Sequence, residues 1–399
     1  MTVKQWVPIA LIYCLGVLAY VNFGAMAPLA KDLGAAVHVS AQSAGATLGV
    51  LYLPMLVAAG IGWASDRIGT RPILLFGTAC LLVDDVANLK VDTLHWLIAD
   101  NFVQGLGIIS LLVGGQTALA QMTSGKTQAG VMALWATTIG VGLSLGSLLS
   151  GMLADKPFWR LCFVVEGIVG LCLAIAALLF IRPRTATMAA EAHRGSFVEL
   201  VGETKVLRLS LAFTLFTVLV IGAAAAWPFY LSKIHNVPIG EIGRMAALAA
   251  PAGIAGSFAV GYLLAQSVMP RNVVLMYVAV AFVSAPVLYS TGTDLRLVTL
   301  AMVAWQFCVG ALSAFTFTML PRLIINKRNI GTATGVQNNM SALAGCGAVP
   351  LFFWIATLSQ ATVVFIALTA ACLACSAIVT PVWRLSAAAP PQPQPQPVQ

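Results

Sequence analysis

The chain has 399 residues, of which 60% are hydrophobic and only 9% are charged, and its formal net charge at pH 7 is +8. A soluble domain carries roughly 25% charged residues, so this composition is too apolar to cover a water-exposed surface. Apolar runs of about 20 residues recur along the whole chain, each long enough to cross the hydrocarbon of a bilayer. They are continuous rather than alternating, which excludes a membrane β-barrel, and no basic run interleaved with aromatic residues supports nucleic-acid binding. The composition therefore predicts an all-α membrane protein.

Twelve membrane spans are predicted, six in each half of the chain. The first six cover residues 6–29, 42–64, 72–91, 94–120, 128–153 and 158–181. The second six cover residues 207–231, 240–265, 271–290, 296–320, 331–357 and 361–382. We expect the first run to remain as a span rather than to be a cleaved signal peptide, because it is longer than a typical signal-peptide core.

The longest polar link divides the chain almost equally. We expect an N-terminal six-helix half over residues 1–181, a central cytoplasmic loop over 182–206 and a C-terminal six-helix half over 207–383. Residues 384–399, rich in proline and glutamine, are expected to form a disordered cytoplasmic tail. With the N-terminus placed in the cytoplasm, fourteen of the 21 lysines and arginines fall on the cytoplasmic side, which favours both termini there.

The two halves contain a weak repeat, seen where the fifth and eleventh spans begin. An offset of 205 residues pairs Thr127 with Thr332, Gly130 with Gly335, Val131 with Val336, Gly140 with Gly345 and Gly142 with Gly347. Because this offset is close to half the chain length, the repeat predicts two pseudo-symmetric halves with a site between them, an arrangement that recurs among transporters.

The segment between the second and third spans, GWASDRIGTRP over residues 62–72, concentrates charge in an otherwise apolar chain. Asp66 lies near the end of the second span, and Arg67 and Arg71 lie where a short link must turn. One interpretation is a charge latch, in which Asp66 pairs with Arg71 or with a neighbouring helix end while the cytoplasmic side is closed. The other is an ordinary basic cytoplasmic loop.

This segment closely resembles the signature loop of the major facilitator superfamily, G-x-x-x-D-R-x-G-x-R. The matching residues are Gly62, Asp66, Arg67, Gly69 and Arg71. The resemblance implies twelve helices in two pseudo-symmetric six-helix halves, transport by alternating access, and a gating role for this loop on the cytoplasmic side. The corresponding segment of the second half keeps Gly261 and a shifted Arg271 but has no acid, so a latch is expected only in the first half.

The fifth span contains GLSLGSLLSG over residues 142–151, which resembles the glycine motif of proton antiporters in that family, G-x-x-x-G-P-x-x-G-G. Gly142, Gly146 and Gly151 match, while Ser147 replaces the proline and Ser150 replaces a glycine. The resemblance implies antiport, with tight helix contact near the central seam. Plain packing of small residues is the alternative.

The fourth span departs from the pattern A-R-F-x-Q-G-x-G of many proton-coupled members of the family. Asp100 and Asn101 stand where alanine and arginine are expected, while Gln104 and the following G-x-G remain. The first span offers Asn22 but no acid. The common proton-coupling scheme of the family therefore does not transfer to this chain.

Four acids lie within the predicted spans: Asp84, Asp85, Asp100 and Glu166. An ionised carboxylate there costs about 3 kcal/mol or more, so each should be protonated, paired or hydrated. Asp100 shares a helix face with Gln104, so it either faces the cavity, to take a proton or a cationic substrate, or is a solvated carboxylate near the outer mouth. Glu166 is expected to be solvated. The third span, with Asp84 and Asp85, is expected to be short or kinked, with its outer half in water.

Candidates for handling protons or substrate are Asp100, Gln104, Asn22, Asn101 and Glu166. The central cavity is expected between spans 1, 4, 5, 7, 8, 10 and 11, and its candidates are Trp135, Trp227, Tyr230, Trp305, Gln306, Asn338 and Asn339. Aromatic rings with a few amides suit an amphipathic organic molecule, including a cation held by cation–π contact. Each residue taken alone is more often part of core packing than a ligand contact.

The sequence predicts a secondary transporter, with proton-coupled efflux of amphipathic compounds as the first interpretation. Import of a small metabolite (an organic acid, sugar or amino acid) is the alternative, and a non-transporting membrane receptor is a third. No nucleophile–base pair, metal-ligand cluster or phosphate-binding loop indicates an enzyme, and neither a cofactor nor a metal is expected. The expected partners are a small-molecule substrate, protons and the lipid bilayer, and the expected setting is a monomer in a bacterial inner membrane.

Overall fold

A computed structural model describes residues 3–26, 28–40, 44, 47–154, 156–181, 202–237, 239–266, 268–290 and 293–382. Within these ranges the structure is helical and contains no strand. The predicted central loop lies almost entirely, and the predicted tail entirely, outside the described residues, as do a few side chains inside helices, that of Trp227 among them.

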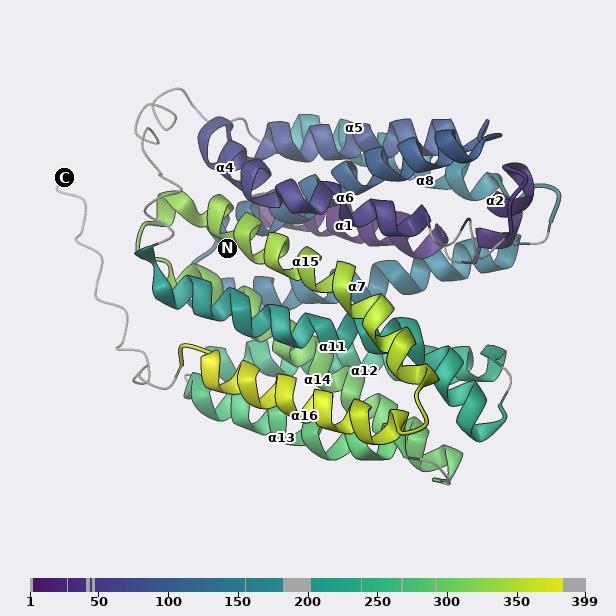
Figure 1. Ribbon diagram of the computed structural model, residues 1–399. Coiled ribbons are helices and arrows are strands. Elements are labelled where there is room, and N and C mark those ends of the chain that lie inside the picture. Colours follow the sequence, from purple (N-terminus) through teal and green to yellow (C-terminus); the bar gives the residue numbers. More distant parts are fainter. Residues whose placement is uncertain are drawn as a thin grey trace.

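The helices form two bundles that follow the order of the chain, drawn above and below one another in Figure 1. The first bundle contains α1 (Val3–Met26), α2 (Ala30–Ala36), the 3₁₀ turns η1 (Thr47–Tyr52) and η2 (Pro54–Val57), α4 (Ala58–Ile68), α5 (Thr70–Asn88), α6 (Leu94–Met122), α7 (Gly125–Leu153) and α8 (Leu161–Phe180). The second bundle contains α11 (Thr204–His235), α12 (Ile239–Ala265), α13 (Pro270–Tyr289), α14 (Leu295–Leu323), the 3₁₀ turn η3 (Lys327–Asn329), α15 (Ile330–Thr357) and α16 (Ala361–Val379).

Ten segments of the described chain are long and apolar enough to cross a membrane. Helices α5, of 19 residues, and α15, of 28 residues, are long enough as well, and α5 carries three charged residues. Together they give the twelve membrane-length segments predicted from the sequence. A hydrocarbon layer offers no water to backbone N–H and C=O groups, and a helix satisfies these groups within one segment.

The second span differs from the continuous helix expected over residues 42–64. Its outer part is two short 3₁₀ turns, and a regular α-helix begins only at Ala58. Pro54, the first residue of η2, has no N–H to donate, so the helical hydrogen bond back to Val50 is missing at this point.

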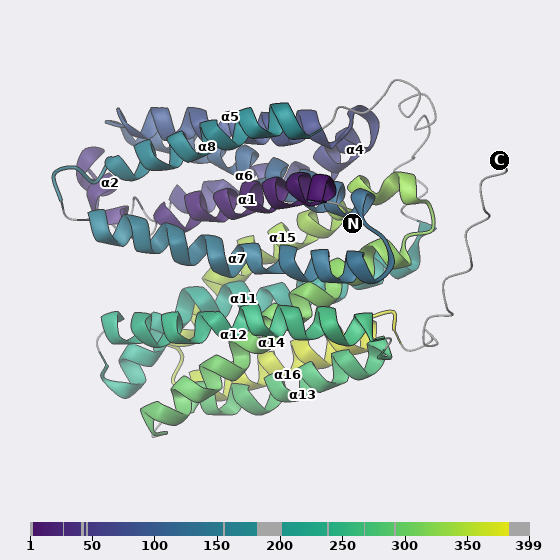
Figure 2. The ribbon, with the colours of Figure 1, turned by 180° about the vertical axis from the view of Figure 1, so that it is seen from behind.

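The bundles touch along two sets of helices. Helix α4 of the first bundle packs against α15 of the second, and α7 packs against α12 and α14 while also contacting α1 in its own bundle. Figure 2 shows α7 lying between α1 and α12. These helices line the seam at which any path between the bundles must open or close.

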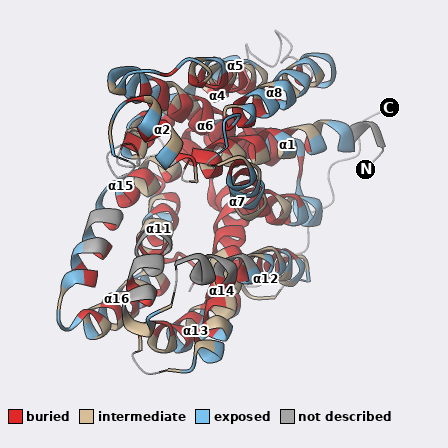
Figure 3. Ribbon diagram, turned by 90° about the vertical axis from the view of Figure 1, so that its right-hand side faces the viewer, coloured by how far each residue is buried: buried red, intermediate tan, exposed pale blue. Residues whose placement is uncertain are grey.

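Burial follows the helix faces. Figure 3 shows buried positions turned toward neighbouring helices and exposed positions on the outside of the molecule. Many exposed side chains are large and apolar, such as Leu179 at 73% and Val283 at 71% exposure. An apolar outer surface is unstable in water and suits contact with lipid chains.

The orientation in the membrane can be tested with two exposed lysines at opposite ends of α7, Lys126 in its first turn and Lys156 just beyond its end. Positive charge favours the cytoplasmic side, so we expect Lys156→Cys to react with a membrane-impermeant maleimide in intact cells and Lys126→Cys to react only after the membrane is opened. The reverse labelling pattern would place the termini outside.

Candidate functional site at the junction of the two bundles

The bundles meet where the last turns of α4 cross the first turn of α15, at the end of the molecule where α1 begins and α16 ends (Figure 1). We call this the inner end, because the sequence predicts it to be cytoplasmic. The Asp66 carboxylate of α4 is only 7% exposed there. Its Oδ1 accepts a hydrogen bond from the Gly331 amide at 2.8 Å, and its Oδ2 accepts from the Thr332 amide at 2.7 Å and hydroxyl at 2.8 Å.

These bonds make Asp66 an N-terminal cap for a helix of the other bundle. Helix α15 begins at Ile330, and the preceding residue, Asn329, makes no side-chain capping bond. The Gly331 and Thr332 amides belong to the first turn, whose N–H groups have no partner inside the helix. A carboxylate here accepts their hydrogen bonds and lies against the positive end of the helix dipole. Two partners are predicted for Asp66, Arg71 or a neighbouring helix end, and the structure shows the helix end.

Glycines bring the two backbones into contact beside this cap. A methyl group on Gly62 would lie 2.0 Å from the Gly331 carbonyl oxygen. One on Gly335 would lie 2.3 Å from the Ala58 carbonyl oxygen. Both distances are far inside van der Waals contact, so any larger residue at either position would force α4 and α15 apart.

The Asn339 carboxamide of α15 makes the reciprocal contact with the start of α4. Its Nδ2 donates to the Leu56 carbonyl at 2.7 Å, and its Oδ1 accepts from the Ala59 amide at 3.0 Å. The residue before α4, Val57, provides no side-chain cap. Each bundle therefore caps a helix of the other. The two caps are about seven residues apart on each helix, which is about two turns.

The other charged residues of the 62–72 segment have separate contacts. The Arg67 guanidinium lies 4.0 Å from the centroid of the Trp63 ring. Arg71 Nη2 donates to the Leu178 carbonyl of α8 at 2.7 Å, which ties the start of α5 to the end of α8. Gly69, between the two arginines, has φ +91°, a conformation that favours glycine and sets the sharp turn from α4 to α5.

The pseudo-symmetric contact between α12 and α7 is built differently. A methyl group on Gly261 would lie 2.6 Å from the Ala133 Cβ and 3.4 Å from the Ala129 carbonyl oxygen. The repeat thus places a glycine at both crossings, but only the α4–α15 crossing has an acid, as the sequence indicates.

A further carboxylate fixes the turn that leads into α15. Glu203, before α11, accepts hydrogen bonds from the Ile325 amide at 3.0 Å and the Asn326 amide at 3.3 Å. In the same turn Lys327 Nζ donates to the Pro321 and Ile324 carbonyls. Burial lowers the pKa of Lys327, and the nearby Glu203 carboxylate opposes that change. This turn positions the helix end that Asp66 caps.

The glycine motif of the fifth span packs within the first bundle. A methyl group on Gly142 would lie 2.4 Å from the Tyr20 Cβ of α1, and one on Gly146 would lie 2.1 Å from the Val21 carbonyl oxygen. Gly151 has open space around it. The tight contact expected near the central seam is therefore made between α7 and α1, because these positions of α7 turn toward its own bundle.

Several aromatic candidates for the cavity are enclosed by packing. Trp135 is 3% exposed, and its ring fills the space next to Gly16 and Gly115. Trp305 is 2% exposed. Tyr230 is also 2% exposed, and its hydroxyl donates to the Tyr289 carbonyl at 2.9 Å. The side chain of Trp227 lies outside the described part of the chain.

The amide candidates fall into different environments. Gln306 is partly exposed, and Asn338 is partly exposed with its Nδ2 bonded to the Thr334 carbonyl of its own helix. Sequence reasoning did not single out Gln337, which is fully buried on α15 with neither amide atom hydrogen-bonded. A buried amide without a partner is uncommon in folded proteins, which makes Gln337 a further candidate for contact with a solute.

A polar group joins α1, α6 and the interrupted second span. Asn22 of α1 is fully buried and both of its amide atoms lack a partner. Gln104 Nε2 on α6 lies 3.5 Å from the Asn22 carbonyl oxygen. Asn101 Nδ2 donates to Thr47 Oγ1 of η1 at 2.8 Å.

The four acids within spans gather between α5, α6 and α8. Their exposed fractions are 0% for Asp84, 3% for Asp85, 4% for Asp100 and 2% for Glu166. Helix α5 is continuous from Thr70 to Asn88, so the expected short or kinked third span in water is wrong. The expected hydration of Glu166 is wrong as well, since the packing of α8 on α5 encloses it.

Asp100 is neither a cavity-facing nor a solvated carboxylate, because it turns toward α5. Asn88 Nδ2 lies 2.5 Å from Asp100 Oδ2 and 3.0 Å from Asp84 Oδ1, and joins the two acids. Cys162 Sγ lies 3.2 Å from Glu166 Oε1. Sequence reasoning missed Asn88, although its spacing of four from Asp84 places both on one helix face.

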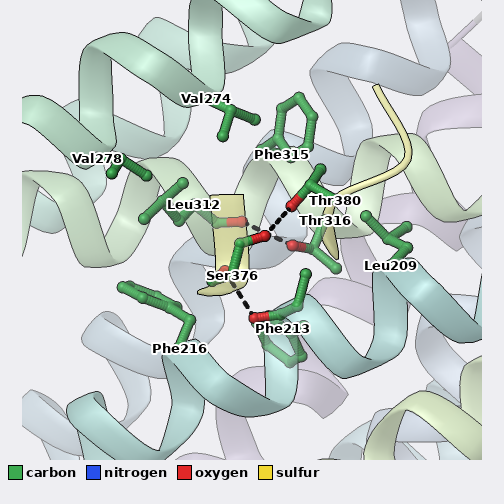
Figure 4. A pocket seen from close by; sticks show the side chains of 11 residues that line it. Leu209, Phe213, Phe216, Val274, Val278, Leu312, Phe315, Thr316, Ser376 and Thr380 are labelled. Carbon is green, nitrogen blue, oxygen red and sulfur yellow. Dashed lines mark hydrogen bonds between the residues drawn. The ribbon is translucent and has the colours of Figure 1, made fainter. Parts of the chain in front are cut away.

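A small cavity lies inside the second bundle, away from the junction. Leu209, Phe213, Phe216, Val274, Val278, Leu312, Phe315, Thr316, Ser376 and Thr380 surround it in Figure 4, together with Ala212. The Ser376 hydroxyl donates to the Ala212 carbonyl at 2.8 Å, and the Thr380 hydroxyl donates to the Ser376 carbonyl. Its volume of about 20 Å³ has room for roughly one water molecule, so it is too small for an organic solute.

Comparison with known proteins identifies the family and shows similar folds. Residues 10–350 match the sequence model of the Major Facilitator Superfamily. The crystal structure of the human organic anion transporter MFSD10 superposes with a TM-score of 0.73 and 14% identity, over 95% of this chain and 98% of that one. The proton:xylose symporter XylE superposes with a TM-score of 0.70 and 12% identity, over 93% of this chain and 94% of that one. These structures show a shared fold.

Curated relatives are similar over different lengths of the chain. The multidrug transporter MdfA of Yersinia pestis bv. Antiqua (strain Angola) is 29% identical over 131 residues, which is 33% of this chain and 32% of that protein. The chain thus matches about a third of the length of this relative. The inner membrane transport protein YajR of Escherichia coli (strain K12) is 23% identical over 337 residues, 81% of this chain and 70% of that protein.

The close α4–α15 contact predicts opposite outcomes for two glycines on one helix. Gly62→Ala should lower stability by about 1–3 kcal/mol, because its methyl group would overlap the backbone of the partner helix. Gly60→Ala should have little effect, because no atom lies within 4 Å of a methyl group there. Thermal unfolding of the purified variants would measure this. Equal unfolding midpoints for both would contradict the contact.

Proposed function

Because the chain belongs to the major facilitator superfamily of transporters, we propose that it exports small amphipathic organic compounds by alternating access, driven by proton exchange. Helical spans, two bundles and the contacts at their inner ends are the parts that such a cycle uses. We place the protein, as a monomer, in a bacterial inner membrane with both termini in the cytoplasm.

The observation that carries the alternating-access part is the pair of caps between α4 and α15. Asp66 and Asn339 satisfy backbone groups of the opposite bundle, and both sets of bonds break if the inner ends separate. Hydrogen bonds to charged groups contribute about 1.5–3 kcal/mol each, so the closed inner end is held by a few discrete, reversible bonds. We propose that this junction is the inner gate, and that the structure corresponds to its closed state.

The export part is supported by the relatives. Several curated relatives are proteins named as multidrug transporters, among them MdfA and the multidrug resistance protein MdtM of Salmonella typhimurium, 30% identical over 126 residues. The buried, unpaired amides of Asn22 and Gln337 are suited to hold polar groups of a solute otherwise bound by apolar contacts. Import of a small metabolite is the competing direction and is an outcome of the transport test below.

The role of Asn339 can be separated from that of its neighbour. Asn339→Leu removes the bonds to the start of α4, whereas Asn338→Leu removes one bond inside α15. With spin labels at Ile68 and Arg328, both exposed at the inner end, we expect Asn339→Leu to lengthen or broaden the distance distribution measured by pulsed electron resonance. The Asn338→Leu variant should keep the parent distribution. The same distribution in all three proteins would remove Asn339 from the gate.

Transport can be tested in everted membrane vesicles that are acidified inside and contain a pH dye. A panel of amphipathic cations, neutral drugs and organic acids is added outside, and proton release is recorded. We expect some amphipathic compounds to release protons, and Asp100→Asn to lose most of that response while Asp92→Asn, an exposed acid just beyond the end of α5, retains it. No release across the panel, together with uptake of labelled sugars, amino acids or organic acids, would reject export.

A further inference from the structure

The carboxyl cluster formed by Asp84, Asp85, Asp100 and Glu166 lies to the side of the path between the bundles. Asp84 and Asp85 are in the last turns of α5, and Asp100 and Glu166 are in the second turns of α6 and α8. These three helix ends meet at the outer end of the first bundle. The gate described above is at the opposite end, so these acids are not part of it.

Arg160 is the cation that lies against the end of α5, and its hydrogen bonds go to backbone carbonyls. Its Nε lies 3.4 Å from the Asn88 carbonyl oxygen, and its Nη2 donates to the Val91 carbonyl at 3.1 Å. Its guanidinium also lies 4.5 Å from the centroid of the Trp159 ring. The arginine thus caps the end of α5.

Three buried oxygen atoms in this region accept no hydrogen bond. Asp84 Oδ2, Asp85 Oδ1 and Asn88 Oδ1 are enclosed and have no hydrogen-bond partner. Asp85 lies against α8, where a methyl group on Gly167 would be 3.6 Å from its Oδ2. The Asn88 oxygen is independent of the acids, because a carboxamide does not ionise and its orphaned oxygen requires a donor.

Hydrogen atoms are what this site lacks. Ionised carboxylates only accept hydrogen bonds. The Asn88 amide nitrogen has two hydrogens to donate. Three oxygens lie within its reach: the Asp84 carbonyl, Asp84 Oδ1 and Asp100 Oδ2. Cys162 offers one weak donor, to Glu166. A proton on a carboxyl oxygen turns that oxygen into a donor and removes a charge from the hydrocarbon layer.

Other ligands fit less well. Among the described residues no group of three or more His, Cys, Asp and Glu side chains is arranged to hold a metal ion. The other helix packed against this region, α1, turns its tyrosines elsewhere: the Tyr13 hydroxyl bonds to Thr137 of α7, and Tyr20 packs on Gly142. Its Leu18 approaches α8 near Gly170.

Polar side chains next to Asp100 on α6 contact α1 and the second span. One turn along α6 from Asp100, the Gln104 amide reaches the Asn22 carbonyl of α1. The residue after Asp100, Asn101, bonds to Thr47 in the interrupted second span, which continues into the gate helix α4. Asp100 therefore lies within one turn of α6 of the residues that contact α1 and the second span.

We propose that this lateral carboxyl cluster is the proton-binding site of the transporter, loaded from the outer side. Each proton taken up converts one carboxylate to a carboxylic acid, and each proton released restores it. The coupling site is thereby built between α5, α6 and α8, beside the solute path and not inside it. The proposal rests on the proton-driven function proposed above and adds the place where the protons bind.

The test is infrared difference spectroscopy of the reconstituted full chain as the pH is changed, with no solute added. Protonated carboxyl groups absorb in a separate carbonyl band, and that band shifts in heavy water. We expect wild-type protein at neutral pH to show the band, and Asp84→Asn, Asp85→Asn, Asp100→Asn and Glu166→Gln each to remove part of it. The matched control, Asp92→Asn, changes an exposed acid and should keep the whole band.

The wild-type spectrum needs no variant to fold, so absence of the band at neutral pH would overturn the proposal directly. A band unchanged in all four variants would also overturn it, as would a band that sodium ions abolish, which would assign the cluster to a metal cation. The two proposals fail separately. A band that behaves as expected without solute-driven proton release rejects export but keeps the proton site, while release that survives all four substitutions rejects the site but keeps export.

Discussion

A helix without its own cap governs how the two halves of this protein meet. Helix α15 begins with amides that no side chain of its own N-cap residue satisfies, and the Asp66 carboxylate of the other bundle accepts their hydrogen bonds. An unsatisfied amide away from water costs about 1–3 kcal/mol, so the first turn of α15 is most stable when the bundles are together at this end. The free energy of the first turn of α15 therefore depends on the position of the first bundle.

The rest of the junction serves this contact. The oxygen atoms of Asp66 reach the α15 amides because Gly62 and Gly335 let the backbones touch, and Glu203 fixes the turn that presents the amides. In the opposite direction, the Asn339 carboxamide of α15 bonds to backbone groups at the start of α4. Because the caps use backbone groups that need partners in every state, separation of the bundles must be accompanied by water entry or by a local change of helix ends. This is a physical reason for a gate with two discrete states.

On the outer side, the interrupted second span and the carboxyl cluster both contact α6. The 3₁₀ turns of η1 and η2 lie between α4 and the Thr47–Asn101 hydrogen bond, so the gate helix and α6 are connected through irregular backbone. Buried charges are costly in a membrane and persist where they have a use. The proton binding proposed for the four acids is such a use.

Hydropathy and segment length are enough to predict where the spans run, because both depend on local composition and need no knowledge of neighbours. The signature loop is likewise a local pattern, and it indicates the family and singles out Asp66. The second span is where this reasoning fails, since the described part before Ala58 is made of 3₁₀ turns, the second of which bonds to the distant amide of Asn339. What the polar residues contact is settled only by packing: Asp66 meets a helix end of the other bundle, and Asn339, expected in a cavity, is a cap whose partners lie about 280 residues away. Hydration is the default expectation for a charge near a helix end, whereas the packing of α5 on α6 and α8 encloses all four acids. Local composition sets the path of a helix, but contacts between helices far apart in the chain set which of its side chains meet.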